Sequence, residues 1–449
     1  MLVSRIPTTV GLRVLVGVIL TGLLSVLDST LVVPLLATIG DEFGAGSEVS
    51  WLIAGYLLTS TVSIPLWGRW MDLRGERNAM WAALLVFFIG TVIAMIATSL
   101  PLLILGRLIQ GVGAGGLVPV GQAIVAARCT GDERARLQVF YNVAYGTAAG
   151  LGPLIGGALI LLGFSWRWAF AAILPVIIIT GLLLWGKLSS RPRESETRRF
   201  DTLGSILMTS GLTLLLLGIE RSWWVAFVAG ILALVAFVSH ALRRRDGLIP
   251  AGLLKSTTIV AASSVALVIG FVQFAMLTFL PHLAQDAAPG LNSGIVVVPL
   301  TLLWLTLGAF TGMLALRIGT KPLAILSVVL AVGASVTVCL STAYSSLLLS
   351  SVLVGAAAGL ILIPALLLSQ HAAPREDVGA ATSFMILMRN FGGAAGAAVV
   401  AVLLVDGGVS LAFGVLAIVA AAALLPALLL PSRETERRVI AAANGSRHT

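Results

Sequence analysis

Two ionisable side chains of opposite charge lie inside long apolar stretches of the chain. Asp28 stands in the stretch from about Val14 to Leu36 and is the only acidic residue well inside such a stretch. Arg107 stands in a later stretch, in the run Arg107-Leu-Ile-Gln110-Gly-Val-Gly. If both stretches are helices that cross a membrane in opposite directions, a rise of about 1.5 Å per residue places the two side chains about 12 Å and about 8 Å below the same surface.

An acid and a cation at similar depth could move a proton. Burial favours the neutral carboxyl group and a nearby guanidinium favours the carboxylate, so a conformational change that alters their separation would load and release a proton. An ionisable group this deep costs on the order of 3 kcal/mol, which indicates a functional role. Two other interpretations stay open: Asp28 is a neutral hydrogen-bonding strut between helices, or Asp28 and Arg107 form a static ion pair.

Composition places these stretches in a membrane protein. Of the 449 residues, 58% are hydrophobic and 10% are charged, and the mean hydropathy is +1.06, which excludes a soluble domain of this length. The apolar stretches are about 20 residues long and do not alternate, so they predict helices rather than the strands of a barrel. The two cysteines, Cys129 and Cys339, imply neither a disulfide framework nor a metal site.

We predict an all-α membrane protein with fourteen transmembrane helices, the first of which is retained rather than cleaved as a signal peptide. The spans are placed near residues 14–36, 49–68, 79–98, 102–126, 138–162, 168–187, 203–219, 223–241, 258–281, 293–315, 322–342, 346–369, 380–403 and 409–430.

The basic residues set the orientation of these spans. With a cytoplasmic N-terminus, 24 of the 28 Lys and Arg fall in inner segments; Arg167 and Arg221 fall outside, and Arg107 and Arg389 lie within spans. This asymmetry predicts a protein of the cell membrane with both termini in the cytoplasm. The net charge of +9 then has a membrane explanation, because basic loops face an anionic leaflet, and nucleic-acid binding is not required.

An internal repeat divides the chain. The turn that begins Gly68-x-x-x-Asp72 recurs 244 residues later as Gly312-x-x-x-Leu316. Three glycine pairs share this offset, namely Gly111 and Gly355, Gly115 and Gly359, and Gly152 and Gly396. Repeated halves around a central site are the plan of transporters in which one half rocks against the other. We therefore predict two pseudo-symmetric six-helix halves, 1–190 and 251–432, with a linker and two inserted helices over 191–250 and a cytoplasmic tail over 433–449.

Several motifs together resemble one family over nearly the whole chain. In chain order they are Leu27-Asp28-Ser-Thr30, the turn from Gly68 to Asn78, a glycine-rich run from Gly146 to Gly157, Trp166-Arg167-Trp168-Ala-Phe170, and Asp201-x-x-Gly204-x-x-Leu207. The chain resembles the fourteen-helix drug:proton antiporter branch of the major facilitator superfamily, in which the arginine matching Arg107 is linked to proton transfer. It departs from the family at Leu73 and Glu76, where basic residues are usual, and at Leu316, where the second copy of the turn lacks its Asp.

The turn after Gly68 has a physical interpretation of its own. Asp72 and the nearby Arg74 and Arg77 can pair with each other or with a facing helix end, and Gly68 and Gly75 permit a tight turn. Exposed pairs are weak, about 0–1 kcal/mol each, which suits a switch. The resemblance implies that this turn latches the cytoplasmic side in one state. The alternative is a solvated basic loop that only sets topology.

The glycine-rich run predicts a closely packed, bent helix, because small residues let helix backbones approach and proline removes a hydrogen bond. Its residues are Gly146, Gly150, Gly152, Pro153, Gly156 and Gly157. The resemblance identifies this run as the antiporter motif, which marks exporters rather than uptake carriers. The spacing alone indicates only close packing.

A substrate cavity between the halves would be lined by apolar and aromatic side chains with a few polar groups, which suits amphiphilic molecules. The candidates are Tyr56, Gln110, Gln122, Asn142, Tyr145, Phe271, Gln273, Phe274, Phe384 and Arg389. Lipid contact and helix packing are the alternatives for each of the aromatic residues. Arg389, a second buried cation, could bind backbone carbonyls or an anionic group of a substrate.

The function that we expect is proton-driven export of hydrophobic or amphiphilic small molecules by a monomer without cofactors or metals. A phosphate-binding Gly-x-x-x-x-Gly-Lys loop is absent and the four histidines are scattered, so neither ATP as the energy source nor an enzyme is indicated. A lipid or metabolite exporter of the same fold is the first alternative. An uptake symporter and a non-transporting membrane sensor are less well supported.

Overall fold

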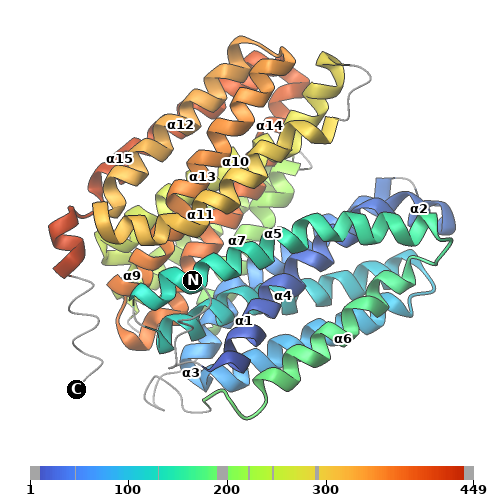
Figure 1. Cartoon of the computed structure of the whole chain (residues 1–449), viewed down its shortest axis with the longest axis horizontal. Helices are drawn as coiled ribbons and strands as arrows, with labels where there is room; N and C mark the ends of the chain where they lie inside the picture. Colours follow the sequence, from blue (N-terminus) through green and yellow to red (C-terminus); the bar gives the residue numbers. More distant parts are fainter. Residues whose placement is uncertain are drawn as a thin grey trace. The chain divides into compact units, whose positions relative to one another are not determined.

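The structure of the chain is a computed structural model that describes residues 11–45, 47–129, 131–189, 201–220, 223–244, 247–288 and 293–438. All regular elements in these residues are helices (Figure 1). Eleven helical segments of this part are long and apolar enough to cross a membrane. The predicted all-α membrane fold is therefore confirmed, whereas the number fourteen stays a prediction.

The described chain separates into two compact units. Unit 1 comprises Met1–Cys129, Phe140–Phe200 and Arg375–Ser383, and unit 2 comprises Thr130–Val139, Asp201–Pro374 and Phe384–Thr449. The predicted division at residues 190, 250 and 432 stays a prediction.

Helices α1 to α6 belong wholly or mainly to unit 1. They are α1 (Leu12–Leu31), α2 (Leu36–Phe43), α3 (Trp51–Met95), α4 (Leu100–Arg128), α5 (Gly131–Leu161) and α6 (Arg167–Leu184). Helix α3 covers two predicted spans and is interrupted at Gly75, whose φ of 84° and ψ of 163° are not helical. A φ in this region is accessible to glycine at little cost. The turn predicted from Gly68 and Gly75 is thus a sharp bend between two arms of one element.

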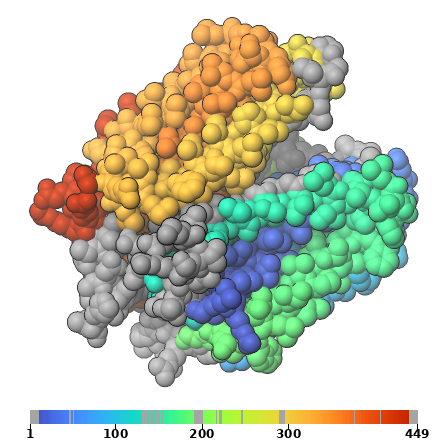
Figure 2. Space-filling view, viewed as in Figure 1, coloured from blue at the N-terminus to red at the C-terminus, as the bar shows by residue number. Residues whose placement is uncertain are grey.

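Helix α4 packs against both arms of α3 through glycines on its two sides. A Cβ on Gly111 or Gly115 would collide with the first arm, and a Cβ on Gly106 or Gly113 would collide with the second arm. Gly90 of the second arm touches the backbone of α4 in the same way. Close backbone approach is the known use of small residues between membrane helices. Figure 2 shows that α1 (blue) and α6 (green) also lie side by side on one face of this unit.

The remaining helices belong wholly or mainly to unit 2. They are α7 (Thr202–Glu220), α8 (Trp224–Arg243), α9 (Ala251–Lys255), α10 (Thr257–Ala287), α11 (Val298–Ile318), α12 (Thr320–Leu340), α13 (Tyr344–Ala372), α14 (Val378–Ala422) and α15 (Leu424–Leu429). Helix α14 is interrupted at Gly408 (φ 72°) and supplies two candidate spans, Val378–Leu404 and Gly407–Leu429.

The packing inside each unit follows the sequence repeat. Gly111 of α4 packs on Tyr56 of α3, and its counterpart Gly355 of α13 packs on Leu300 of α11. Tyr56 and Leu300 are themselves 244 residues apart. The turn glycines Gly75 and Gly319 likewise share a positive φ, 84° and 91°. Matching contacts at a constant offset indicate that the glycine pairs found in the sequence are not chance matches.

Candidate functional site

Asp28 of α1 has no exposed surface and sits in a network of hydrogen bonds with α3 and α4. Arg107 Nη1 donates to Asp28 Oδ2 at 2.7 Å, and Gln110 Nε2 donates to Asp28 Oδ1 at 2.8 Å. Arg107 Nη1 also donates to Gln110 Oε1 at 2.6 Å. The acid and the cation that the sequence placed at similar depth therefore meet, and both carboxylate oxygens are satisfied.

The network extends along one face of α3. Gln110 Nε2 donates to Thr91 Oγ1 at 2.8 Å, and the Thr91 hydroxyl donates to the carbonyl of Phe87, also at 2.8 Å. The structure thus places Gln110, which the sequence suggested for a substrate cavity, beside the buried acid with no exposed surface. Sequence reasoning missed Thr91, because a threonine can bond back to its own helix and gives no signal by itself.

Besides its ion pair with Asp28, Arg107 contacts a backbone carbonyl and two aromatic rings. Its Nε donates to the carbonyl of Leu52 at 3.0 Å, and its Cζ lies 4.2 Å from the ring centre of Tyr56 and 5.9 Å from that of Phe170. Cation–π contacts of this kind are strongest where water is excluded. Its Nη2 is buried and has no hydrogen-bond partner among the described residues. Both N–H groups of Nη2 are therefore left over in this arrangement.

Tyr56, another predicted cavity residue, supports this site from α3. Its side chain is only 2% exposed and its hydroxyl donates to the carbonyl of Ser25 on α1 at 3.0 Å. The ring of Tyr56 thereby lies against the guanidinium of Arg107 while its hydroxyl fixes the turn of α1 that precedes Asp28. One residue of α3 thus positions both members of the ion pair.

Asp72, the predicted latch acid, is fully buried and binds the start of α14. Its Oδ1 accepts from the amide of Gly379 at 3.1 Å and its Oδ2 accepts from the amide of Ala380 at 2.8 Å. A carboxylate at these positions accepts from amides that have no partner within the helix and meets the positive end of the helix dipole. Of the two kinds of partner proposed for Asp72 from the sequence, these hydrogen bonds show the facing helix end.

The bend at Gly75 carries a second ion pair that the sequence did not reveal. Glu76, noted above as a departure from the family, is bound by Arg128 at the end of α4, with Arg128 Nε at 3.1 Å from Glu76 Oε2. Arg128 Nη1 also donates to the carbonyl of Lys187, and the amide of Arg77 donates to the carbonyl of Ser189. The sequence analysis did not pair these two residues, which are 52 positions apart.

The glycine-rich run of α5 lies against the helix that carries Asp28. A Cβ on Gly152 would collide with Thr30, and a Cβ on Gly156 would collide with the carbonyl of Leu31. Gly157, by contrast, would have nothing within 4 Å of its added Cβ. The structure does not describe the surroundings of five predicted residues of α5, namely Gly146, Gly150, Pro153, Asn142 and Tyr145.

The difference between these two glycines gives a matched test. We expect Gly152→Ala to push α5 away from α1, because the new methyl group would meet Thr30, and to lower both the Tm and the transport rate. We expect Gly157→Ala to leave both unchanged. Thermal melting of the purified variants, followed by size-exclusion chromatography, measures the first quantity. Equal behaviour of the two variants would contradict close packing at Gly152.

Five further cavity candidates lie in unit 2, on α10 and α14. Gln273 is 1% exposed and its Oε1 has no hydrogen-bond partner among the described residues. The guanidinium carbon of Arg389 lies 5.8 Å from the ring centre of Phe274 and 4.9 Å from that of Trp304. The sequence analysis considered backbone carbonyls and an anionic substrate group as partners of Arg389, and the structure shows aromatic rings beside it as well. Phe384 of α14, Phe271 of α10 and Gln122 of α4 are buried.

Asp201, the first residue of the motif before α7, caps that helix. Its Oδ1 accepts from the amide of Gly204 at 2.9 Å and faces His240 Nε2 at 2.9 Å, and its Oδ2 accepts from the amide of Leu248 at 3.1 Å. Burial alone would raise the pKa of Asp201, but these hydrogen bonds and the imidazole hold it below its usual value. The motif therefore ties α7, α8 and the following loop together.

These features define a class, namely a helical membrane protein with a buried acid–cation pair between glycine-packed helices. The family model described as Major Facilitator Superfamily matches residues 18–342 and 262–448. The chain therefore belongs to the major facilitator superfamily, whose members are membrane transporters, and the resemblance to this superfamily is confirmed.

Two curated proteins are similar to the chain in sequence. The chain is 28% identical over 382 residues to the "Multidrug transporter protein MdtP" of Bacillus subtilis (strain 168), covering 82% of this chain and 70% of the relative. It is 30% identical over 321 residues to the "Efflux pump FUS6" of Gibberella fujikuroi, covering 66% of this chain and 57% of the relative. The chain thus spans little more than half the length of the second relative.

Two solved structures share the fold. The human organic anion transporter MFSD10 (TETRAN) superposes with a TM-score of 0.70 at 20% identity, covering 93% of this chain and 99% of that one. The proton:xylose symporter XylE superposes with a TM-score of 0.66 at 15% identity, covering 92% and 94%. At these identities the likeness shows the fold alone.

Proposed function

We propose that the chain is a proton-coupled antiporter that exports hydrophobic or amphiphilic small molecules by alternating access. The observation that carries this proposal is the fully buried hydrogen-bond network of Asp28, Arg107 and Gln110. A carboxylate bound by a single cation and one amide can exchange the cation for a proton when the surrounding helices move. Relatives named as a multidrug transporter and an efflux pump support export and support this class of substrate.

In the proposed cycle, Asp28 carries the proton and Arg107 competes with it. When Arg107 contacts Asp28, as in this structure, the carboxylate is balanced by the guanidinium. When α1 or α4 moves and the contact opens, a proton takes the place of the cation. The leftover Nη2 of Arg107 makes its bound position incompletely satisfied, which lowers the free-energy cost of leaving it. Substrate binding on one side and proton binding on the other would then favour different states.

The rest of the proposal concerns topology and direction. Counting the two arms of α3 separately and adding α5 and α7 gives fourteen crossings, with both termini in the cytoplasm and the cell membrane as the location. The energy source is the proton gradient, without a cofactor, and the functional unit is a monomer. Asp72 of α3, which binds the start of α14, acts as the latch of one state. The second candidate is proton-coupled uptake, because a proton:xylose symporter is among the solved structures that share the fold.

A gradient experiment tests this function. We expect cells that lack other efflux systems and express the chain to retain less ethidium, an amphiphilic fluorescent dye, than cells with an empty vector. A protonophore should abolish the difference within minutes while cellular ATP is held constant by glycolysis. A panel of neutral and anionic dyes extends the test to other substrates. Export that continues after the gradient collapses would contradict proton coupling, and dye accumulation above the control would favour uptake.

A further inference from the structure

A carboxylate on α2 joins three segments near the end of the helix that carries Asp28. Glu42 Oε2 accepts from Trp166 Nε1 at 2.6 Å, and Glu42 Oε1 accepts from Arg167 Nη1 at 2.9 Å. Arg167 Nη2 donates in turn to the carbonyl of Ala97 at 2.8 Å, just beyond the second arm of α3. The guanidinium also lies 4.2 Å from the ring centre of Trp166. We call Glu42, Trp166 and Arg167 the clasp.

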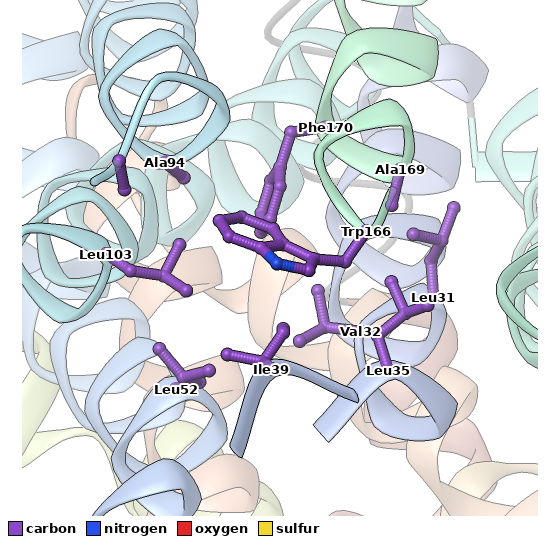
Figure 3. Packing of buried hydrophobic residues seen from close by; sticks show 11 residues of the cluster. Leu31, Val32, Leu35, Ile39, Leu52, Ala94, Leu103, Trp166, Ala169 and Phe170 are labelled. Atoms are coloured by element: carbon purple, nitrogen blue, oxygen red, sulfur yellow. The ribbon is translucent and has the colours of Figure 1, made fainter. Parts of the chain in front are cut away.

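The clasp closes over a buried apolar cluster that reaches the proton site. Figure 3 shows the indole of Trp166 among side chains of α1, α2, α3, α4 and α6. The residues of the cluster are Leu31, Val32, Leu35, Ile39, Leu52, Ala94, Ala97, Leu103, Trp166, Ala169 and Phe170. The interior of such a cluster is packed densely, so a displacement of Trp166 is felt by its neighbours.

Two members of this cluster also touch Arg107. Phe170 follows Trp166 by one helical turn, packs edge-on against it at 6.1 Å between ring centres, and lies 5.9 Å from the Arg107 guanidinium. Leu52 contributes its side chain to the cluster and its carbonyl to Arg107 Nε. A continuous set of contacts therefore leads from Glu42 through Trp166 and Phe170 to Arg107.

We propose that the clasp of Glu42, Trp166 and Arg167 is a positioning device that holds Phe170 and Leu52 against Arg107 and thereby keeps the guanidinium on Asp28. This inference rests on the proposed role of Asp28 as the proton carrier. The clasp residues do not touch Asp28 themselves. They fix the start of α6, which carries Phe170, and the residue Ala97 just after α3. Leu52, at the start of α3, belongs to the same buried cluster as Trp166 and Ala97.

The clasp is built to respond to acid. Burial would raise the pKa of Glu42, but the hydrogen bonds from Trp166 and Arg167 and the charge of Arg167 hold it below its usual value. Because this pKa is lower when the clasp is closed, the closed form gains stability above the pKa of the free carboxyl group and loses it as the pH falls through the lowered value. An acidic medium therefore loosens the clasp, in the same direction that loads Asp28 with a proton.

The test reads the protonation of Asp28 directly and needs no transported substrate. Dicyclohexylcarbodiimide reacts with protonated buried carboxyl groups, so its labelling of Asp28, measured by mass spectrometry against pH, reports when the carboxyl group is neutral. Among the described residues, the charged and titratable side chains in contact with Asp28 are Arg107 and Tyr56. With the hold of Arg107 weakened in Glu42→Gln, we expect the labelling midpoint to move to higher pH by about one unit.

Trp166→Phe gives a second, milder variant, because it removes the indole N–H and keeps an aromatic ring in the cluster. It should move the midpoint in the same direction by less. Glu434→Gln is the matched control, since it breaks the exposed Glu434–Arg438 pair outside the cluster. A clasp that only stabilises the fold would lower the Tm of Glu42→Gln and Trp166→Phe and leave both midpoints at the wild-type value, which would overturn the inference.

The result is separable from a failure of the proposed function. If Asp28→Asn still couples proton flux to export, Asp28 is not the proton carrier, whatever the labelling shows. If that variant loses coupling while Glu42→Gln has an unchanged midpoint, the function stands and the clasp is not a positioning device.

Discussion

Substrate-driven proton flux should fall to the level of empty liposomes in Asp28→Asn. An asparagine presents a permanently neutral group and cannot take up or release a proton. Its amide nitrogen would also face either Arg107 Nη1 or Gln110 Nε2, both of which are donors in this structure. A buried donor left without an acceptor costs about 1–3 kcal/mol, so the Tm should also fall. The measurement is pyranine fluorescence in proteoliposomes after addition of ethidium.

A stability defect and a coupling defect can be separated with two further variants. Asp28→Glu keeps the charge and extends it by one methylene group, so it should retain partial flux with a shifted pH dependence. The double variant Asp28→Asn with Arg107→Gln removes the uncompensated buried cation and should regain part of the lost Tm without regaining flux. If Asp28 were a structural strut, transport would recover together with stability. Undiminished flux in the asparagine variant would exclude Asp28 as the coupling site.

The sequence could predict the meeting of Asp28 and Arg107 because depth in a membrane follows from counting residues along a helix. It could not predict which way each helix is rotated. The structure buries Gln110 and Tyr56 against the ion pair, which the sequence did not indicate, and a place for them in a substrate cavity stays a prediction. Rotation is decided by packing, here by the glycines of α4 that meet the two arms of α3.

Polar pairs between residues far apart in the sequence were the second kind of feature that could not be predicted. The motif containing Trp166 and Arg167 was recognisable, but its partner Glu42 lies 124 residues away from Trp166 and has no pattern of its own. The same holds for Glu76 and Arg128. For Asp72 the sequence predicted one of two kinds of partner, a nearby cation or a facing helix end, and the structure shows hydrogen bonds to a helix end. The kind of partner was therefore predictable, whereas the helix that supplies it was not.

Turnover should fall roughly tenfold in Asp72→Asn, while the substrate Kd stays within about twofold of wild type. The carboxylate caps two amides at the start of α14, and replacing a capping charge costs about 1–2 kcal/mol of the state in which the cap is formed. Such a loss shifts the balance between two states by roughly 5–30-fold. Because Asp72 belongs to the turn at Gly75 and not to the network of Asp28, substrate binding itself should be little affected.

A chemical probe shows whether the latch opens. Ser383 is fully buried, in the part of α14 that packs on Gly68, so a cysteine at this position should react slowly with a water-soluble maleimide. In a background with Cys129→Ala and Cys339→Ala, we expect Ser383→Cys to react several times faster when combined with Asp72→Asn. Arg74→Gln, which changes an exposed side chain of the same turn, is the matched control and should leave the reaction slow. A loss of substrate affinity with unchanged turnover and unchanged labelling would exclude Asp72 as a latch and leave it as a structural cap of α14.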